Sequence, residues 1–199
     1  MTLLCDIARE EGTDKGVGGG TMSGRSHGYT QHYYEIWKDR AHEALTMIEI
    51  GVEEGRSIAM WRRFFPNALI YGWDINPPRY KRAPEPRTHI DWVNTLFPVT
   101  VELAIARTSL EATSYTNELP KFDFIVDDGN HRDADQQSNL NILLPYLNPD
   151  RGVYCIEDHD TIEAIDYVKV PAGYRLDIFC NQSPHADSLL QVIRHDNHS

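Results

Sequence analysis

The sequence predicts an α/β fold, a three-layer sandwich whose mostly parallel, seven-stranded sheet carries an antiparallel strand near the C-terminus. Two observations lead to this prediction. Short apolar runs typical of buried strands alternate with longer segments whose apolar residues recur at helical spacing. The chain has 199 residues, 41% hydrophobic and 25% charged, enough for one core. Neither a repeat nor a linker divides it, so we expect one domain over residues 1–199.

The predicted strands are short segments rich in apolar, β-branched and aromatic residues. The seven runs cover residues 46–51, 68–74, 89–94, 122–128, 152–158, 174–180 and 188–195. We expect the last two to form an antiparallel pair. The others alternate with helices and should lie parallel, which brings their carboxyl ends to one edge of the sheet. Ligands of such sheets bind at that edge, so the residues that end each strand are the candidate site.

Helices are predicted from apolar stripes and capping signals. The segments are 30–45, 57–65, part of 97–119 and a helix from Asp133 that Pro145 limits. The first has apolar residues at four-residue intervals from Tyr33 to Leu45. Ser57 is expected to be the N-cap of the second helix. Asp133, with Gln136 three residues later, is typical of a capping box.

Charge and cysteine content restrict the partners and the compartment. The net charge of −11 repels phosphate backbones and anionic lipid, so we expect neither nucleic acid nor a membrane as partner. No run approaches the roughly 20 apolar residues of a membrane span, and we expect a cytoplasmic protein. A homo-oligomer is compatible with the sequence. Cys5, Cys155 and Cys180 are odd in number and far apart, which argues against a disulfide framework or a zinc site.

A glycine-rich stretch stands near the N-terminus. Seven of the thirteen glycines lie between Gly12 and Gly28, a density that does not support helix or strand. Two interpretations stay open at this stage: a loose terminal segment, or a lid loop over about 12–28 that closes over a ligand.

The first predicted strand ends in an acidic, glycine-containing turn. Glu49 is followed by Gly51 and Gly55, and the helix that begins at Ser57 can direct amide groups at a ligand. A pyrophosphate would be repelled by Glu53 and its acidic neighbour in this turn. The turn therefore favours a cationic ligand over a dinucleotide.

The next two strands end in residues suited to a nucleoside. Asp74 ends the second strand, where a carboxylate can accept both hydrogen bonds of a ribose diol. Asn94 ends the third strand, where an adenine edge can be met. An acidic turn with a ribose carboxylate predicts S-adenosylmethionine, whose sulfonium group is positive.

Two further strands end in clustered carboxylates. If 122–128 and 152–158 are parallel neighbours, Asp128, Glu157 and Asp158 converge at one edge. Three carboxylates repel one another without a cation, and hard oxygen ligands suit Mg²⁺ or another divalent ion better than zinc. Asp127 should point to the other side of its strand, since side chains alternate, and is expected to face the cofactor.

His131 lies within a few residues of the predicted metal. A histidine with a near-neutral pKa can remove a proton from an alcohol, and a divalent ion lowers the pKa of that alcohol. We expect His131 and Asp128 to be the catalytic residues. The alternative is that His131 only caps the helix that follows. His159 and Asp160 are adjacent to the predicted ligands and are further candidates to bind the metal.

Six motifs, in order along residues 11 to about 160, carry a resemblance to a known family. They are "EGTDKG", "HGYTQHYYEIW", "IEIGVEEGRSIAMW", "IYGWDI", "FDFIVDDGNH" and "YCIED". Together they resemble the class I S-adenosylmethionine-dependent methyltransferases that methylate sugars in macrolide biosynthesis, of the mycinamicin and macrocin O-methyltransferase type. The resemblance implies a Rossmann-like sheet in a single methyltransferase domain. The chain departs from it at Glu53, where family members tend to have glycine.

The resemblance also implies roles for individual residues. It implies magnesium ligands at Asp128, Glu157 and Asp158, and a general base at His131. It implies that Thr13, Lys15 and Tyr29 hold the methionine part of the cofactor, and that Glu49, Gly51 and Asp74 hold the rest.

These inferences predict a metal-dependent O-methyltransferase that acts on a sugar hydroxyl of a glycoside or natural product. One alternative keeps the cofactor and changes the acceptor to a catechol-like or other small metabolite. A second is a nicotinamide-dependent oxidoreductase, which the acidic turn disfavours. A third is a non-catalytic protein that binds the nucleoside.

Overall fold

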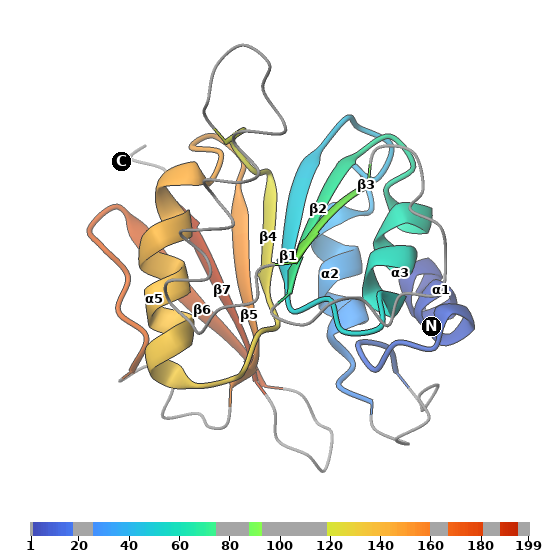
Figure 1. The fold of residues 1–199 in the computed structure, drawn as a ribbon, viewed down its shortest axis with the longest axis horizontal. Helices are drawn as coiled ribbons and strands as arrows, with labels where there is room; N and C mark the ends of the chain where they lie inside the picture. The colour runs from blue at the N-terminus through green and yellow to red at the C-terminus, as the bar shows by residue number, and fades with distance from the viewer. Residues whose placement is uncertain are drawn as a thin grey trace.

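The chain forms three layers, with a twisted sheet between helices on its two faces (Figure 1). The structure is a computed structural model, and it describes residues 2–17, 26–74, 88–92, 119–159, 167–180 and 188–194. The predicted α/β class is confirmed. Residues 97–118 of the segment expected to contain a helix, residues 18–25 of the predicted lid loop (about 12–28), and the candidates Asn94 and Asp160 lie outside the described residues.

All seven predicted strands are present. They are β1 (Thr46–Ile50), β2 (Leu69–Asp74), β3 (Thr88–Trp92), β4 (Phe124–Asp127), β5 (Val153–His159), β6 (Tyr174–Cys180) and β7 (Ser188–Arg194). They pair in the order β3-β2-β1-β4-β5-β7-β6. The first five strands pair parallel, and β7 is antiparallel to both of its neighbours. The strand order reverses between β1 and β4, which is where ligands of open α/β sheets bind.

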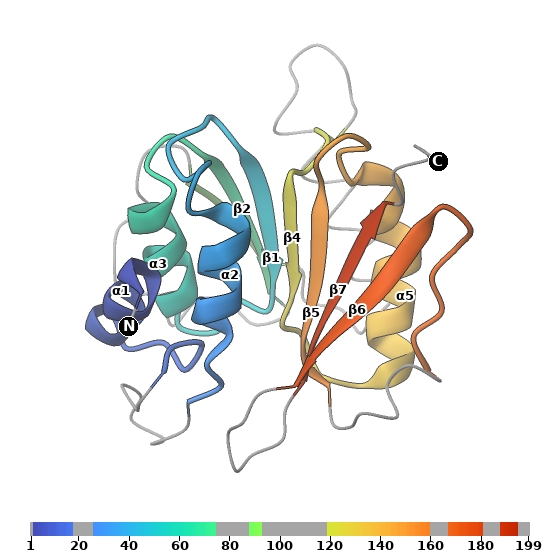
Figure 2. The same ribbon diagram turned by 180° about the vertical axis from the view of Figure 1, so that it is seen from behind.

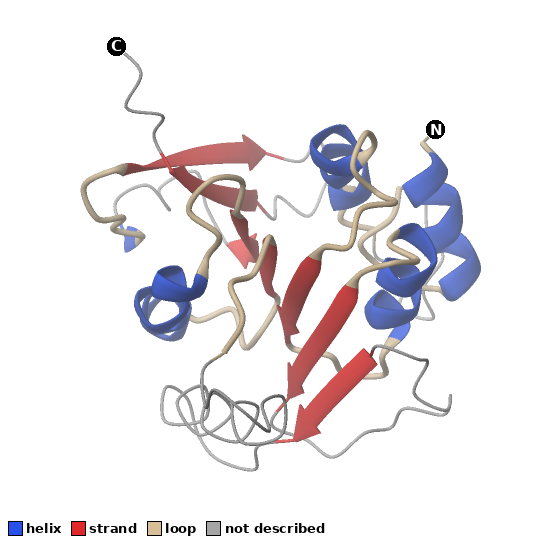
Figure 3. Cartoon of the chain, turned by 90° about the horizontal axis from the view of Figure 1, so that it is seen from above, coloured by secondary structure: helices blue, strands red, loops and turns tan. Residues whose placement is uncertain are grey.

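The helices divide between the two faces of the sheet (Figures 2 and 3). Helices α1 (Leu3–Glu11), α2 (Tyr29–Trp37) and α3 (Arg56–Phe64) cover one face, and α5 (Asp133–Leu143) covers the other, followed by the short 3₁₀ helix η1 (Leu144–Tyr146). Two apolar clusters match this division. Within the described part of the chain, no helix combines the length and the apolar character needed to cross a bilayer.

Three helix predictions need correction. Helix α2 ends at Trp37, because turns at Lys38 and Arg40 redirect the chain, although the predicted apolar stripe is buried as far as Leu45. Ser57 is not an N-cap: α3 begins after Gly55, whose φ of 76° supplies the turn. At α5, Asp133 and Gln136 form no capping box, and the cap position is Arg132 without a side-chain hydrogen bond.

Helix α1 was not expected from the sequence. The Thr2 hydroxyl accepts a hydrogen bond from the Cys5 amide, and Gly12 ends the helix in the left-handed region with its amide bonded to the Ala8 carbonyl. The free thiols of Cys5 and Cys155 are buried. Cys155 packs in the apolar cluster of the face that α1, α2 and α3 cover, whereas the Cys5 thiol contacts the hydroxyl groups of Thr2 and Thr30 at 3.0 and 3.1 Å.

Gly51 joins the first strand to the turn after β4. Its φ is 85°, and a Cβ added there would lie 1.8 Å from the backbone oxygen of Asp128. The Asp128 amide donates a hydrogen bond to the Ile50 carbonyl at 2.9 Å, which holds the two turns together. Glycine is therefore required here by a close approach of backbone to backbone.

We predict that Gly51→Ala lowers the free energy of unfolding by about 3 kcal/mol or more, because backbone must move and a positive φ is strained. Gly173→Ala is the matched control: its φ is 91°, with no atom within 4 Å of an added Cβ. That variant should lose only about 1–2 kcal/mol. Urea denaturation measures both, and equal losses would contradict the steric explanation.

Candidate functional site

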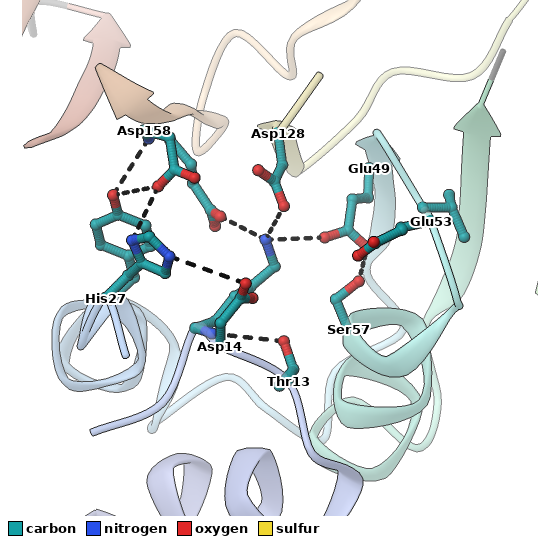
Figure 4. A network of polar contacts seen from close by, with 12 residues as sticks. Thr13, Asp14, His27, Glu49, Glu53, Ser57, Asp128 and Asp158 are labelled. Carbon is teal, nitrogen blue, oxygen red and sulfur yellow. Dashed lines mark hydrogen bonds and ion pairs between the residues drawn. The ribbon is translucent and has the colours of Figure 1, made fainter. Parts of the chain in front are cut away.

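The strand ends gather acidic side chains at one edge of the sheet, as predicted. Strands β4 and β5 are parallel neighbours with Asp127 opposite Ile156, so the residues that follow lie side by side. Figure 4 shows the carboxylates of Asp128 and Glu49 around one centre, with Asp158 beside it and with Asp14 and His27 reaching the same region from the N-terminal segment.

A buried ammonium group occupies the middle of these carboxylates. The Lys15 side chain is 2% exposed, and its Nζ lies 2.5 Å from Asp128 Oδ2 and 3.4 Å from Glu49 Oε1. It also donates a short hydrogen bond to Glu157 Oε2. One lysine from a loop thus contacts the ends of β1, β4 and β5.

Burial and the charge of Lys15 act in opposite directions on the pKa values of the three carboxylates. Burial favours the neutral form of Asp128, but Lys15 and the hydrogen bond from His131 outweigh it and hold the pKa below the usual value. Burial dominates at Glu157 and raises its pKa well above the usual value, in spite of Lys15. Burial also raises the pKa of Glu49 to about 7, with Lys15 opposing.

Glu157 lies deeper than the predicted metal site required. Its second oxygen, Oε1, accepts a hydrogen bond from the Tyr33 hydroxyl at 2.5 Å, and the residue is 1% exposed. Both of its oxygens therefore have protein donors. Tyr33, which sequence reasoning placed only in an apolar stripe, is a second residue that fixes the site.

Asp158 turns toward solvent because the strand is irregular there. Its φ is 55°, and the pairing of β5 with β7 shifts register between Ile156 and His159. The Tyr29 hydroxyl donates to Asp158 Oδ1 at 2.7 Å, and His27 Nδ1 lies 3.2 Å from the same oxygen. Burial first, then the Asp128 charge, raises the pKa of Asp158.

His131 completes a group that fits a metal ion. Its Nε2 lies 3.2 Å from Asp128 Oδ1 and 3.7 Å from Asp158 Oδ2, and its side chain is 41% exposed. Ligand atoms of these three residues all lie within 4.8 Å of one another. The structure thus brings His131 to Asp128 and Asp158 and directs Glu157 to Lys15. The hydrogen bond with Asp128 raises the pKa of His131.

Strained backbone coincides with this site. Among the described residues, positive φ at a non-glycine position occurs at Glu53, His131 and Asp158. Such conformations cost about 1–3 kcal/mol each and persist where the surroundings enforce them. Two of the three belong to the metal-fitting group, and the third lies in the turn after β1.

The turn after β1 differs in detail from the prediction. Asp74 Oδ2 accepts hydrogen bonds from the amides of Val52 and Glu53, at 2.9 and 2.7 Å, so this carboxylate also braces the turn. The Ser57 hydroxyl donates to Glu49 Oε2 at 2.8 Å. The other Glu49 oxygen, Oε1, is buried and lies 3.4 Å from Lys15 Nζ, an ion pair that lacks hydrogen-bond geometry.

Asp127 points away from this group, as the alternation predicted, but it does not lie open to a ligand. Its carboxylate accepts hydrogen bonds from the Asn139 amide, at 3.0 Å, and from the Tyr154 hydroxyl, at 3.3 Å. Burial raises its pKa to about 7. From the same helix, Gln136 donates to the Glu157 carbonyl. Asp127 thus secures α5 to the strands that carry the site.

Two other candidate residues, Thr13 and His159, make few polar contacts. Thr13 is buried, and its hydroxyl accepts a weak hydrogen bond from the Lys15 amide at 3.5 Å. His159 is buried beneath the start of α5, with Nε2 3.4 Å from Asp133 Oδ1 and neither ring nitrogen hydrogen-bonded. It lies apart from the metal-fitting group, so the structure gives no support to its use as a spare ligand.

We predict that Asn139→Ala lowers the free energy of unfolding by about 1–3 kcal/mol, because Asp127 loses its closest hydrogen-bond donor in a buried place. Asn141, on the same helix, is exposed and serves as the control. Its replacement by Ala should cost at most about 0.5 kcal/mol. Thermal and urea unfolding measure the pair; similar losses would refute a buried role for Asn139.

Comparison with known proteins agrees with this architecture. No protein-family model matches the chain. It is 30% identical over 166 residues to an 8-demethyl-8-alpha-L-rhamnosyl tetracenomycin-C 2'-O-methyltransferase of Streptomyces olivaceus, covering 79% of this chain and 38% of that enzyme. It is 27% identical over 143 residues to a mycinamicin VI 2''-O-methyltransferase of Micromonospora griseorubida, covering 66% and 31%.

A solved structure extends the likeness over nearly the whole chain. The MycE methyltransferase from the mycinamycin biosynthetic pathway, in complex with Mg and SAH, matches with a TM-score of 0.68 and 21% identity, covering 98% of this chain and 56% of that one. The chain thus spans about a third of the length of these curated relatives and about half of MycE. Its fold is the class I methyltransferase fold, and the resemblance to the sugar O-methyltransferases of natural-product pathways is confirmed.

Proposed function

We propose that this chain is an S-adenosylmethionine-dependent O-methyltransferase that acts on a sugar hydroxyl of a natural product and uses a divalent metal ion. The observation that carries the proposal is the meeting of Asp128, His131 and Asp158 at the strand ends of a methyltransferase sheet. Its sequence relatives are named for methylation of a rhamnosyl or mycinamicin hydroxyl group.

The described residues fit the cofactor. Glu49 is a buried acidic residue next to the turn between Gly51 and Gly55, and its Oε1 has an ion pair with Lys15 but no hydrogen bond. Acidic residues around this turn suit a cation, and Asp74 lies at its end. The cofactor supplies a methyl group on positive sulfur, which transfers as the S–CH₃ bond breaks and the O–CH₃ bond forms.

The described residues also fit a divalent ion. Asp128 and Asp158 would hold it. Glu157, the third predicted ligand, would have to leave Lys15 to reach the same ion. Carboxylate oxygens are the ligands that Mg²⁺ prefers. A bound divalent ion lowers the pKa of a neighbouring hydroxyl group and so makes its proton easier to remove.

We propose that His131 takes that proton, and the contacts of its ring support this role. Both nearby carboxylates face Nε2, and carboxylates only accept hydrogen bonds, so the neutral ring carries its proton on Nε2 and keeps the lone pair on Nδ1. The exposed side of the ring is open to an acceptor. Asp128 holds the ring in place and stabilises the imidazolium that forms.

The direct test is methyl transfer followed by mass spectrometry, with S-adenosylmethionine and either glycosides carrying free rhamnosyl hydroxyls or catechols as acceptors. We expect a gain of one methyl group on a glycoside, and loss of this activity in excess EDTA with recovery on adding Mg²⁺. Transfer to catechols alone would refute the sugar acceptor. Full activity in EDTA would remove the metal from the proposal.

His131→Ala separates a general base from a metal ligand. As the base, the residue should contribute about 10²–10⁴-fold to kcat, while calorimetry finds the affinities for S-adenosylhomocysteine and Mg²⁺ unchanged. If affinity for Mg²⁺ falls with activity, His131 is a ligand instead. His42→Ala, at an exposed histidine outside the site, should behave as the unchanged protein.

A further inference from the structure

The most unusual group in the described residues is the Lys15 ammonium. A lysine at 2% side-chain exposure is rare, because burial removes the hydration of its charge. Here three carboxylates replace that hydration, from Asp128, Glu157 and Glu49. These partners lie 34 to 142 residues away along the chain, so the contacts are tertiary and belong to the fold.

The backbone around Lys15 is fixed as firmly as its side chain. The Thr30 amide donates to the Lys15 carbonyl at 3.0 Å, and the Gly28 amide donates to the Gly16 carbonyl at 2.9 Å. A third bond of 2.8 Å runs from the His27 amide to the Asp14 carbonyl. The two stems of the glycine-rich loop, residues 14–16 and 27–30, are therefore hydrogen-bonded to each other. Lys15 lies on one stem and Tyr29 on the other.

Lys15 binds oxygens that a divalent ion would also require. Asp128 gives Oδ2 to Lys15 and Oδ1 to His131, and Glu157 gives its two oxygens to Lys15 and Tyr33. An ammonium and a divalent ion at the same oxygens repel each other strongly where water is excluded. Both cations cannot hold these carboxylates as the structure arranges them.

We propose that Lys15 is an internal counterion that competes with the divalent ion, so that binding of the ion to Asp128 and Glu157 displaces the ammonium from them. The carboxylates thereby stay paired in either state. This inference rests on the proposed metal site, and it assigns to Lys15 a role toward the ion in addition to the cofactor contact that the resemblance implies.

The test compares Mg²⁺ binding by calorimetry for the unchanged chain, Lys15→Met and Lys38→Met. Lys38 pairs with Glu35 on an exposed part of α2, so its variant controls for the loss of one positive charge. Competition predicts that Lys15→Met binds Mg²⁺ at least tenfold more tightly, whereas Lys38→Met is unchanged. It also predicts a lower Tm for Lys15→Met in EDTA and a larger rise in Tm on adding Mg²⁺.

A measurement on the unchanged chain decides the matter if Lys15→Met fails to fold. Reductive methylation followed by peptide mass spectrometry should find Lys15 protected in EDTA and at least several-fold more reactive in saturating Mg²⁺. Equal or weaker Mg²⁺ binding by Lys15→Met, or protection that Mg²⁺ leaves unchanged, overturns the competition and leaves the metal site standing. If no form binds Mg²⁺, the proposed metal fails, and the competition with it.

Discussion

The arrangement of the strand ends depends on one electrostatic contact, a single buried ammonium among two buried carboxylates and the half-buried carboxylate of Asp128. Glu49, Asp128 and Glu157 close three neighbouring strands, and without Lys15 their mutual repulsion would oppose the packing of those ends. The attraction reaches from the N-terminal loop to the centre of the sheet. It therefore sets where the loop stems lie, where Tyr29 meets Asp158, and how α2 sits over the site.

The apolar pattern of the sequence predicted the strands well, whereas the ends of the helices were harder to predict from capping residues. Strands β1, β2, β4 and β5 were found because each contains a run of apolar residues that is buried along nearly all of its length. Strand β6, at the edge of the sheet, was found although Arg175 and Asp177 interrupt its apolar residues. Ser57 suggested an N-cap, but Gly55 supplies the turn and frees the hydroxyl for Glu49. Helix α1 was missed for want of a long apolar stripe, although Thr2 and Gly12 mark its two ends.

The site was predictable in composition but not in pairing. Parallel strands bring their ends together, which placed Asp128 beside Glu157 and Asp158. Strict alternation could not foresee the irregularity that turns Asp158 outward while Glu157 remains buried. Nor did any local pattern reveal that Lys15 would reach across more than a hundred residues, because long-range ion pairs leave no mark on spacing.

The joined stems of the glycine-rich loop have a consequence for how such a chain can vary. Three backbone hydrogen bonds close the base of the loop, so the positions of Lys15 and Tyr29 do not depend on the span between them. The entropic cost of closing a loop grows only slowly with its length. Insertions and deletions in this span are thus expected to cost little stability, because the hydrogen bonds that position Lys15 and Tyr29 lie outside it.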